Sequence, residues 1–230
     1  RRGIRRLFRG RSRYARSRYS ASQRVILKAS YVRHKGKAIK KLSAHIKYLE
    51  RGSARGDEGA WFTHEGEERQ GHEATSRWGK DKRHWRFILS PERGEDLDLE
   101  EFTKEWMQGV QTELGVHFEW FAVCHYDSKH PHVHILIRGV DRDGNEFLIP
   151  RDYIKHGGRE LAERIATREL GTRTKLEIER ARTREIHALR FTRLDRELIA
   201  AAGEGKELNI GDKRLTKDSR LLKRLFVLEE

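Results

Sequence analysis

The histidine-rich stretch at residues 124–134 restricts the possible folds more than any other part of the chain. Four of the twelve histidines fall within ten residues there. They stand at the junction of two runs, 119–126 and 132–138, whose apolar and β-branched residues are typical of strands. The residues between the runs, 127–131, have the length of a hairpin loop. The sequence therefore predicts an antiparallel hairpin with several imidazoles near its closed end.

Side chains of a strand alternate between two faces, so His132 and His134 point to the same side, about 6.5–7 Å apart along the strand. An antiparallel return places His125 opposite the start of the second strand, where a third imidazole reaches the same point. Three neutral nitrogens on a rigid hairpin form a metal site with open positions, which suits catalysis better than a structural role. His130 could replace His125, although a proline separates it from the strand. The alternative is a surface strand that happens to contain histidines.

Asp127 lies in the predicted loop beside these histidines. Its carboxylate can accept an imidazole N–H or act as a base for a nearby hydroxyl, whereas its alternative role is to cap the loop. A divalent ion held by histidines can polarise a phosphate group. Cleavage of a phosphodiester also requires a nucleophile. Cys124 points to the opposite face of its strand and is therefore not the expected nucleophile. The candidate nucleophiles are a metal-activated water and a tyrosine.

Tyr48 is the tyrosine whose position best suits that role. It lies in a predicted amphipathic helix at 39–51 and is rotated by roughly 120° from the apolar stripe, at about 100° per residue. Lys41, Ala44 and His45 lie on its side of the helix. They leave the phenol accessible, in positive surroundings that favour its ionised form. The alternative is a half-buried tyrosine at the edge of the helix.

The chain carries 50 Lys and Arg against 36 Asp and Glu, and much of this excess lies at its start. Residues 1–24 hold ten arginines and no acidic residue, which leaves a balance of +4 for the remainder. A segment with so much charge and so few apolar residues cannot collapse. We therefore expect a flexible Arg-rich tail at 1–23 that binds phosphate backbones through counterion release and base stacking. A solvated linker is the alternative.

Composition also limits the cellular setting. The single cysteine excludes a disulfide framework, and no apolar run approaches the roughly 20 residues that cross a bilayer. We therefore expect a soluble protein inside the cell. The chain begins at Arg1 and its only methionine is Met107, so we expect a fragment of a longer gene product, in which a targeting signal cannot be judged.

The remaining pattern predicts layers of sheet and helix. Residues 52–82 are rich in Gly, Glu, Arg and Ser, and we interpret them as a mobile loop in which Trp61 and Phe62 are a docking point. Loosely spaced apolar residues at 176–198 predict a polar helical segment without a clear core face. Further strands are expected at 24–33 and 84–90, and helices at 39–51, at 97–114 and from 158 onward.

Three motifs resemble those of HUH-type DNA relaxases, the mobilisation nucleases that nick plasmid or integrative-element DNA at a transfer origin. Residues 125–134, followed by Ile-Leu-Ile, resemble the third motif of that family. Residues 44–52, AHIKYLERG, are similar to the first motif in the branch that includes the T-DNA border nuclease. Residues 84–91, HWRFILSP, are similar to the second motif, a strand that ends in Ser-Pro. The resemblance covers roughly residues 24–170.

This resemblance implies a compact α+β domain at 24–170 with a central antiparallel sheet packed by helices, and with the metal and the nucleophile on one face. It leaves 171–230 as a helical accessory or DNA-contacting segment. Many relatives have Asn after the histidine strand, where this chain has a basic residue that we expect to hold DNA phosphate instead. The implied site residues are the nucleophile Tyr48, the metal ligands His125, His132 and His134, the supporting acid or base Asp127, and the DNA contacts Ser90, Lys129 and Arg138.

The implied activity is site- and strand-specific nicking and joining of single-stranded DNA at a transfer origin, by tyrosine transesterification with Mg, Mn or Zn. It leaves a 5′-phosphotyrosyl protein and a free 3′-hydroxyl. The implied partners are that DNA, relaxosome accessory proteins and a type IV secretion coupling protein. The implied location is the bacterial cytoplasm without membrane insertion, with translocation alongside DNA as an option. The alternatives are a rolling-circle replication initiator, a non-catalytic DNA-binding protein with a structural metal, and a hydrolase that uses water.

Overall fold

The computed structural model describes residues 21–34, 38–51, 61–68, 77–126, 130–202, 208 and 218–229. The chain divides into two compact units, of which the larger contains Ser22–Thr172 and the smaller contains Arg173–Glu230. Residues 1–20 of the predicted Arg-rich tail lie outside the described residues. Among the helices that the structure describes, none has the length and apolar character that crossing a membrane requires.

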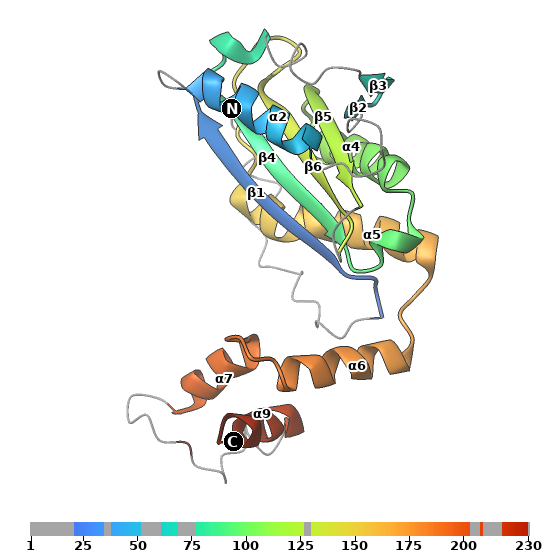
Figure 1. Ribbon diagram of the computed structural model, residues 1–230, viewed down its shortest axis with the longest axis vertical. Coiled ribbons are helices and arrows are strands. Elements are labelled where there is room, and N and C mark those ends of the chain that lie inside the picture. The colour runs from blue at the N-terminus through green and yellow to red at the C-terminus, as the bar shows by residue number, and fades with distance from the viewer. Residues whose placement is uncertain are drawn as a thin grey trace. The chain divides into compact units, whose positions relative to one another are not determined.

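The larger unit is built on a six-stranded sheet with the order β1-β4-β6-β5-β2-β3, in which neighbouring strands are antiparallel (Figure 1). The predicted α+β fold with a central antiparallel sheet is confirmed. β6 lies between β4 and β5, and β1 forms one edge. The strands are β1 (Val25–Arg33), β2 (Trp61–Thr63), β3 (Gly66–Glu68), β4 (Arg83–Pro91), β5 (Phe118–His125) and β6 (His132–Asp141).

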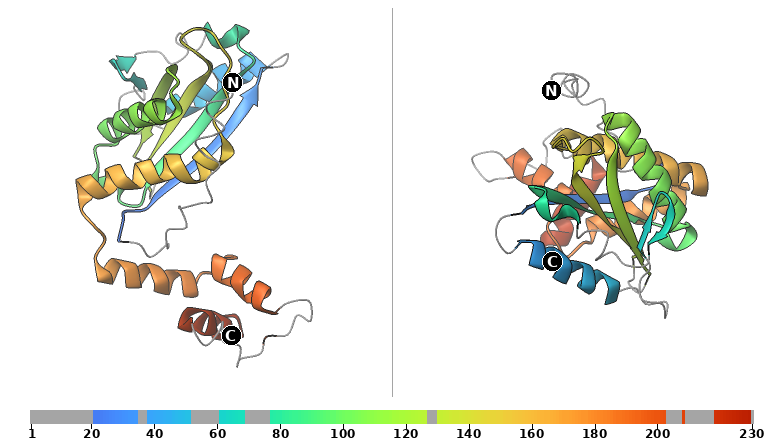
Figure 2. Two further views of the ribbon diagram at one scale, coloured as in Figure 1. Left: turned by 180° about the vertical axis from the view of Figure 1, so that it is seen from behind. Right: turned by 90° about the horizontal axis from the view of Figure 1, so that it is seen from above.

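Helices cover both faces of this sheet (Figure 2). On one face, which we call the core face, α4 and α5 pack on the main apolar core. On the other, the α2 face, α2 lies over a smaller apolar cluster. The helices are α2 (Ala38–Arg51), α4 (Leu99–Leu114) and α5 (Gly158–Leu170), and the shorter helical turns are η1 (Arg77–Lys80), η2 (Gly94–Asp96) and η3 (Tyr153–Gly157).

Alternation along β6 decides which of its side chains reach which face. Val133, Ile135 and Ile137 belong to the main core and are each 0 % exposed. The intervening residues 132, 134, 136 and 138 point to the α2 face, where Leu136 packs in the smaller cluster. The same strand therefore stabilises the fold on one side and presents polar groups on the other.

The residues at the two ends of α4 explain where the helix begins and ends. The side chain of Asp98 accepts hydrogen bonds from two backbone N–H groups of the first turn, each at 3.0 Å. Gly115, with φ of 63°, ends the helix in the left-handed region that favours glycine. Phe102, Trp106 and Val110 form the buried stripe between these ends. The observed helix is the one that the sequence places at 97–114.

Part of the stretch that the sequence predicts as a mobile loop is regular structure. Trp61 and Phe62 lie in β2, with Phe62 opposite Ala122 of β5. Trp61 is 1 % exposed and belongs to the cluster under α2, while Phe62 is 2 % exposed and belongs to the main core. Both rings are therefore buried within their own unit, and the prediction of a loop was wrong for 61–68 and 77–80. Residues 52–60 and 69–76 lie outside the described residues.

The smaller unit has its own core, formed between α6 (Lys175–Ile186), α7 (Arg193–Ala202) and α9 (Ser219–Glu229). Ile186, Leu194 and Leu198 meet apolar residues of α9 there. Two helices with a break between them replace the single loose pattern that the sequence suggests. A buried ion pair joins Arg224 to Asp195, with Nε and Oδ1 2.8 Å apart.

Candidate active site

The β5–β6 hairpin brings the three predicted imidazoles together on the α2 face. His125 pairs with His132 across the hairpin, and Val123 pairs with His134. One ring nitrogen from each of His125, His132 and His134 lies within 4.8 Å of the others. Register and alternation alone produce this cluster, because all three positions share one face of a paired hairpin.

Backbone carbonyls orient two of these rings. Nδ1 of His132 donates a hydrogen bond to the carbonyl oxygen of His130 at 3.0 Å, so a neutral His132 ring carries its lone pair on Nε2. Nε2 of His125 donates to the carbonyl oxygen of Leu49 in α2 at 3.0 Å, which leaves the lone pair on Nδ1. His130, the alternative ligand in the sequence interpretation, contributes its backbone to the site in this way.

The donor set fits a divalent metal ion. Nε2 of His132 and Nε2 of His134 lie 3.2 Å apart, less than two metal–nitrogen bonds of about 2.0–2.1 Å laid end to end. Burial, helped by the neighbouring imidazoles of His125, His132 and His45, lowers the pKa of His134 to about 3. The ring is therefore neutral at physiological pH, which is the form that binds a metal. His125, His132 and His134 are the residues that would hold the ion.

Tyr48 lies on the solvent side of α2 and is 71 % exposed. Its ring stacks beside that of His45, with the centroids 6.5 Å apart and the planes 15° from parallel. Leu42, Ile46 and Leu49 anchor the opposite side of the helix in the cluster under α2. The carbonyl oxygen that holds His125 belongs to Leu49, the residue after Tyr48. The accessible phenol that the sequence predicts is therefore carried by the helical turn that contacts the histidine cluster.

The other predicted site residues have different surroundings, and some lie outside the described residues. Ser90 lies at the end of β4, where its hydroxyl donates to the carbonyl oxygen of Pro131 at 3.4 Å. Asp127 and Lys129 lie outside the described residues, so their roles stay predictions. Cys124 packs against the main core, on the side away from the histidines as predicted, and burial raises the pKa of its thiol to about 12.

Arg138 has two acidic partners. Its Nε donates to Asp81 at 2.8 Å and its Nη2 donates to the other oxygen of the same carboxylate at 3.2 Å. Its Nη1 donates to Glu119 at 3.3 Å, and the indole of Trp78 donates to that same glutamate oxygen. These bonds tie β6 to η1 and β5. They give Arg138 a structural task, and its contact with DNA phosphate stays a prediction.

A polar chain on the same face was missed at the sequence level. His84 and Arg86 lie on the α2 side of β4, and Nε of Arg86 donates to Nε2 of His84 at 3.1 Å. Nδ1 of His84 lies 2.7 Å from Nε2 of His34 at the end of β1. The signal was present in β4, because residues 84, 86, 88 and 90 alternate with the buried Trp85, Phe87 and Leu89. What was missing is the pairing that brings His34 alongside.

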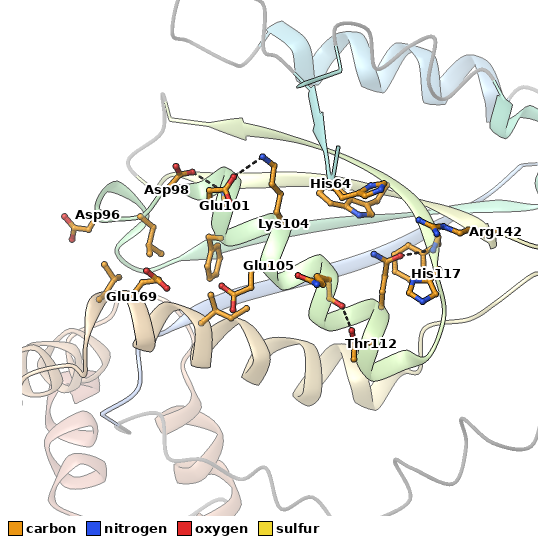
Figure 3. A pocket seen from close by; sticks show the side chains of 18 residues that line it. His64, Asp96, Asp98, Glu101, Lys104, Glu105, Thr112, His117, Arg142 and Glu169 are labelled. Atoms are coloured by element: carbon orange, nitrogen blue, oxygen red, sulfur yellow. Dashed lines mark hydrogen bonds and ion pairs between the residues drawn. The ribbon is translucent and has the colours of Figure 1, made fainter. Parts of the chain in front are cut away.

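A hollow of about 760 Å³ lies elsewhere in the unit. It is lined by residues of α4, β5 and the β2–β3 turn, together with Arg142 and Glu169 (Figure 3). Figure 3 shows the carboxylates of Asp96, Glu101 and Glu105 among them. An acidic lining repels a polyanion, and the histidine cluster does not line this hollow. It is therefore not a candidate for the phosphate chemistry.

The histidine cluster and Tyr48 both fall within the segment that resembles a known family. A family model described as "Relaxase: MobA/VirD2-like, nuclease domain" matches residues 48–169, which is more than half of the chain. A search of curated proteins found no match.

Proposed function

Because this chain belongs to the MobA/VirD2-like relaxase family, and is thus a DNA-nicking relaxase, we propose that it cuts and rejoins one DNA strand at a transfer origin through Tyr48. The observation that carries the proposal is the position of an exposed phenol on the helical turn whose carbonyl oxygen holds His125. A structural tyrosine would be buried with the leucines of α2, and this one is not.

The proposed reaction is a transesterification. The phenolate oxygen of Tyr48 attacks the scissile phosphorus and forms a new P–O bond, while the bond to the 3′ oxygen breaks and that oxygen takes up a proton. The products are a 5′-phosphotyrosyl protein and a free 3′-hydroxyl, so no phosphoester bond is lost and the strand can be rejoined. In this proposal Asp127 accepts the phenol proton. A divalent ion held by the three histidines would offset negative charge on the scissile phosphate.

The residues around the phenol support this role. His45 stacks beside the ring of Tyr48. Burial, together with the positive charge of Arg86, lowers the pKa of His45. The proposal extends to the biology of the family: mobilisation of DNA from the cytoplasm, with accessory proteins at the origin and a secretion coupling protein as partners.

The test is a denaturing-gel assay for a covalent adduct. Protein and Mg²⁺ or Mn²⁺ are mixed with end-labelled single-stranded oligonucleotides tiled from the DNA that flanks its gene. We expect a metal-dependent adduct on the 3′-side fragment that EDTA and Tyr48→Phe both abolish, while the Tyr48→Phe protein still binds the strand. Tyr31→Phe is the matched control, because Tyr31 is also exposed but packs its ring against Trp85 on the core face. Cleavage without an adduct would replace the tyrosine mechanism with attack by water.

A further inference from the structure

A hollow of about 300 Å³ opens on the α2 face next to the histidine cluster, between α2 and the strands β1, β4 and β6. These elements lie side by side in Figure 1. The apolar side chains of Ile88 and Leu136 contribute to its lining, Lys28 and Arg86 contribute cations, and His45 contributes an imidazole. No acidic residue is among the described residues that line it. An apolar surface beside cations suits a nucleotide, which pairs a flat base with a phosphate.

Arg86 is held in this hollow by a directional chain of hydrogen bonds. The carbonyl oxygen of Asp81 can only accept, so Nδ1 of His34 donates to it at 2.7 Å. Nε2 of His34 then accepts from Nδ1 of His84, and Nε2 of His84 accepts from Nε of Arg86. One proton on each neutral ring satisfies every bond in the chain. Burial and the charge of Arg86 lower the pKa of His84 to about 3, which keeps that ring neutral.

The guanidinium of Arg86 lacks an acidic partner within the described part of the chain, unlike its neighbours. Arg138, opposite His84 in the sheet, binds Asp81 and Glu119. Arg83, on the same strand, binds Glu146. Arg86 is half-buried, and its burial lowers its pKa. A partly buried cation without a counterion is costly, and a bound anion removes that cost.

We propose that this hollow binds the nucleotide next to the scissile phosphate, with Arg86 holding the phosphate of that nucleotide. His84 and His34 are then positioning residues, because they act through the orientation of Arg86. Lys28 at the β1 rim adds positive charge, and His134 belongs to both the hollow and the histidine cluster, so the two sites are continuous. This inference rests on the proposed function, since it needs a single strand in the site.

The test measures binding without cleavage. A fluorescein-labelled oligonucleotide that spans the nick is titrated against Tyr48→Phe protein in EDTA, and the anisotropy is followed. Adding Arg86→Gln should weaken binding by about tenfold or more and reduce the salt slope by about 0.7, the share of one phosphate on a single strand. Arg83→Gln is the matched control, because its cation already has a carboxylate, and it should leave affinity and salt slope unchanged.

A methylphosphonate scan then locates the contact. Replacing one phosphate near the nick by a neutral methylphosphonate should weaken binding by the Arg86 protein and have no further effect on Arg86→Gln. His84→Leu should shrink that position-specific effect, and His84→Gln, which retains an acceptor, should restore part of it. If Arg86→Gln folds, by its thermal melt, and keeps the wild-type affinity and methylphosphonate response, the inference is overturned while adduct formation at Tyr48 still supports the proposed function.

Discussion

The two faces of the sheet in the larger unit differ in what their residues do. On the core face, Val133, Ile135 and Ile137 of β6 are fully buried against α4 and α5. On the α2 face, the same strand presents His132 and His134 beside a much smaller apolar cluster. Most of the apolar burial thus lies on one side, and the candidate active site lies on the other. The α2 face can present polar groups because the core face supplies most of the apolar burial.

This comparison is tested most strongly by two neighbours on β6. We expect His134→Ala to keep its fold and to lose nicking by more than about 100-fold, since losing even an outer partner of a metal ligand costs about 10–100-fold. Ile135→Ala should instead lose about 2–5 kcal/mol of unfolding free energy. Adduct yield and urea unfolding, measured on both proteins, separate the effects. Equal loss of stability in the two variants would show that the faces do not divide their tasks.

The pH dependence of stability sharpens the comparison, because a buried neutral histidine lies on the α2 face. The pKa of His84 is lowered from 6.5 to about 3. The unfolded chain therefore takes up a proton near pH 6.5 that the folded protein takes up only near pH 3. Its contribution to stability is complete above pH 6.5 and is lost as the pH falls toward 3, by up to about 2 kcal/mol at pH 5.

Urea unfolding at pH 7 and pH 5 checks this expectation. His84→Gln should lose less stability on acidification than the wild-type protein does. His117→Gln, which changes an exposed histidine of the same unit, should behave like the wild type. The same loss in all three proteins would assign the acid sensitivity to other groups.

A smaller effect is expected at Arg138, which lies on the α2 face but has structural bonds. Arg138→Gln leaves the carboxylate of Asp81, whose side chain is 8 % exposed, without its cation. The expected cost is about 1–2 kcal/mol of unfolding free energy, with DNA affinity changed less than by Arg86→Gln. Anisotropy and urea unfolding measure the two quantities. A large loss of affinity at unchanged stability would make Arg138 a DNA contact, as the sequence suggests.

The smallest effect is expected at Ser90. Its hydrogen bond to Pro131 is long, at 3.4 Å, so Ser90→Ala should cost less than about 1 kcal/mol of stability. If the hydroxyl contacts DNA, the adduct yield at limiting DNA should fall by about twofold to fivefold. Thr112→Ala on α4 removes an exposed hydroxyl near the core face and serves as the control. Identical adduct yields for the two variants would remove Ser90 from the DNA-binding surface.

Local pattern was sufficient to predict much of this fold. Runs of apolar and β-branched residues predicted β1, β4, β5 and β6, and the spacing of apolar residues predicted α2 and α4. The predicted hairpin also placed the three histidines next to one another, because a strand pair with a short loop has little freedom in register. The family match agrees with the motif-based resemblance over most of the larger unit.

The features that were missed depend on contacts between distant residues. β2 has only three residues, and its two aromatic rings are buried because β5 lies beside it. The bond between His34 and His84 joins residues 50 positions apart. In the smaller unit, Leu221 completes a core whose other members look too sparse along α6 and α7. No local pattern carries information of this kind.

The alternation along β6 has a consequence for how errors in folding are filtered. If the hairpin closed one residue out of register, its imidazoles would turn into the main core, and its valine and isoleucines would turn to the α2 face, where the apolar cluster is smaller. Such a chain forfeits the burial that holds a domain of marginal stability together. A chain with this register error is therefore unfolded, not folded with a defective active site. Unfolded protein is open to proteolysis, so the error removes the enzyme instead of altering where it cuts DNA.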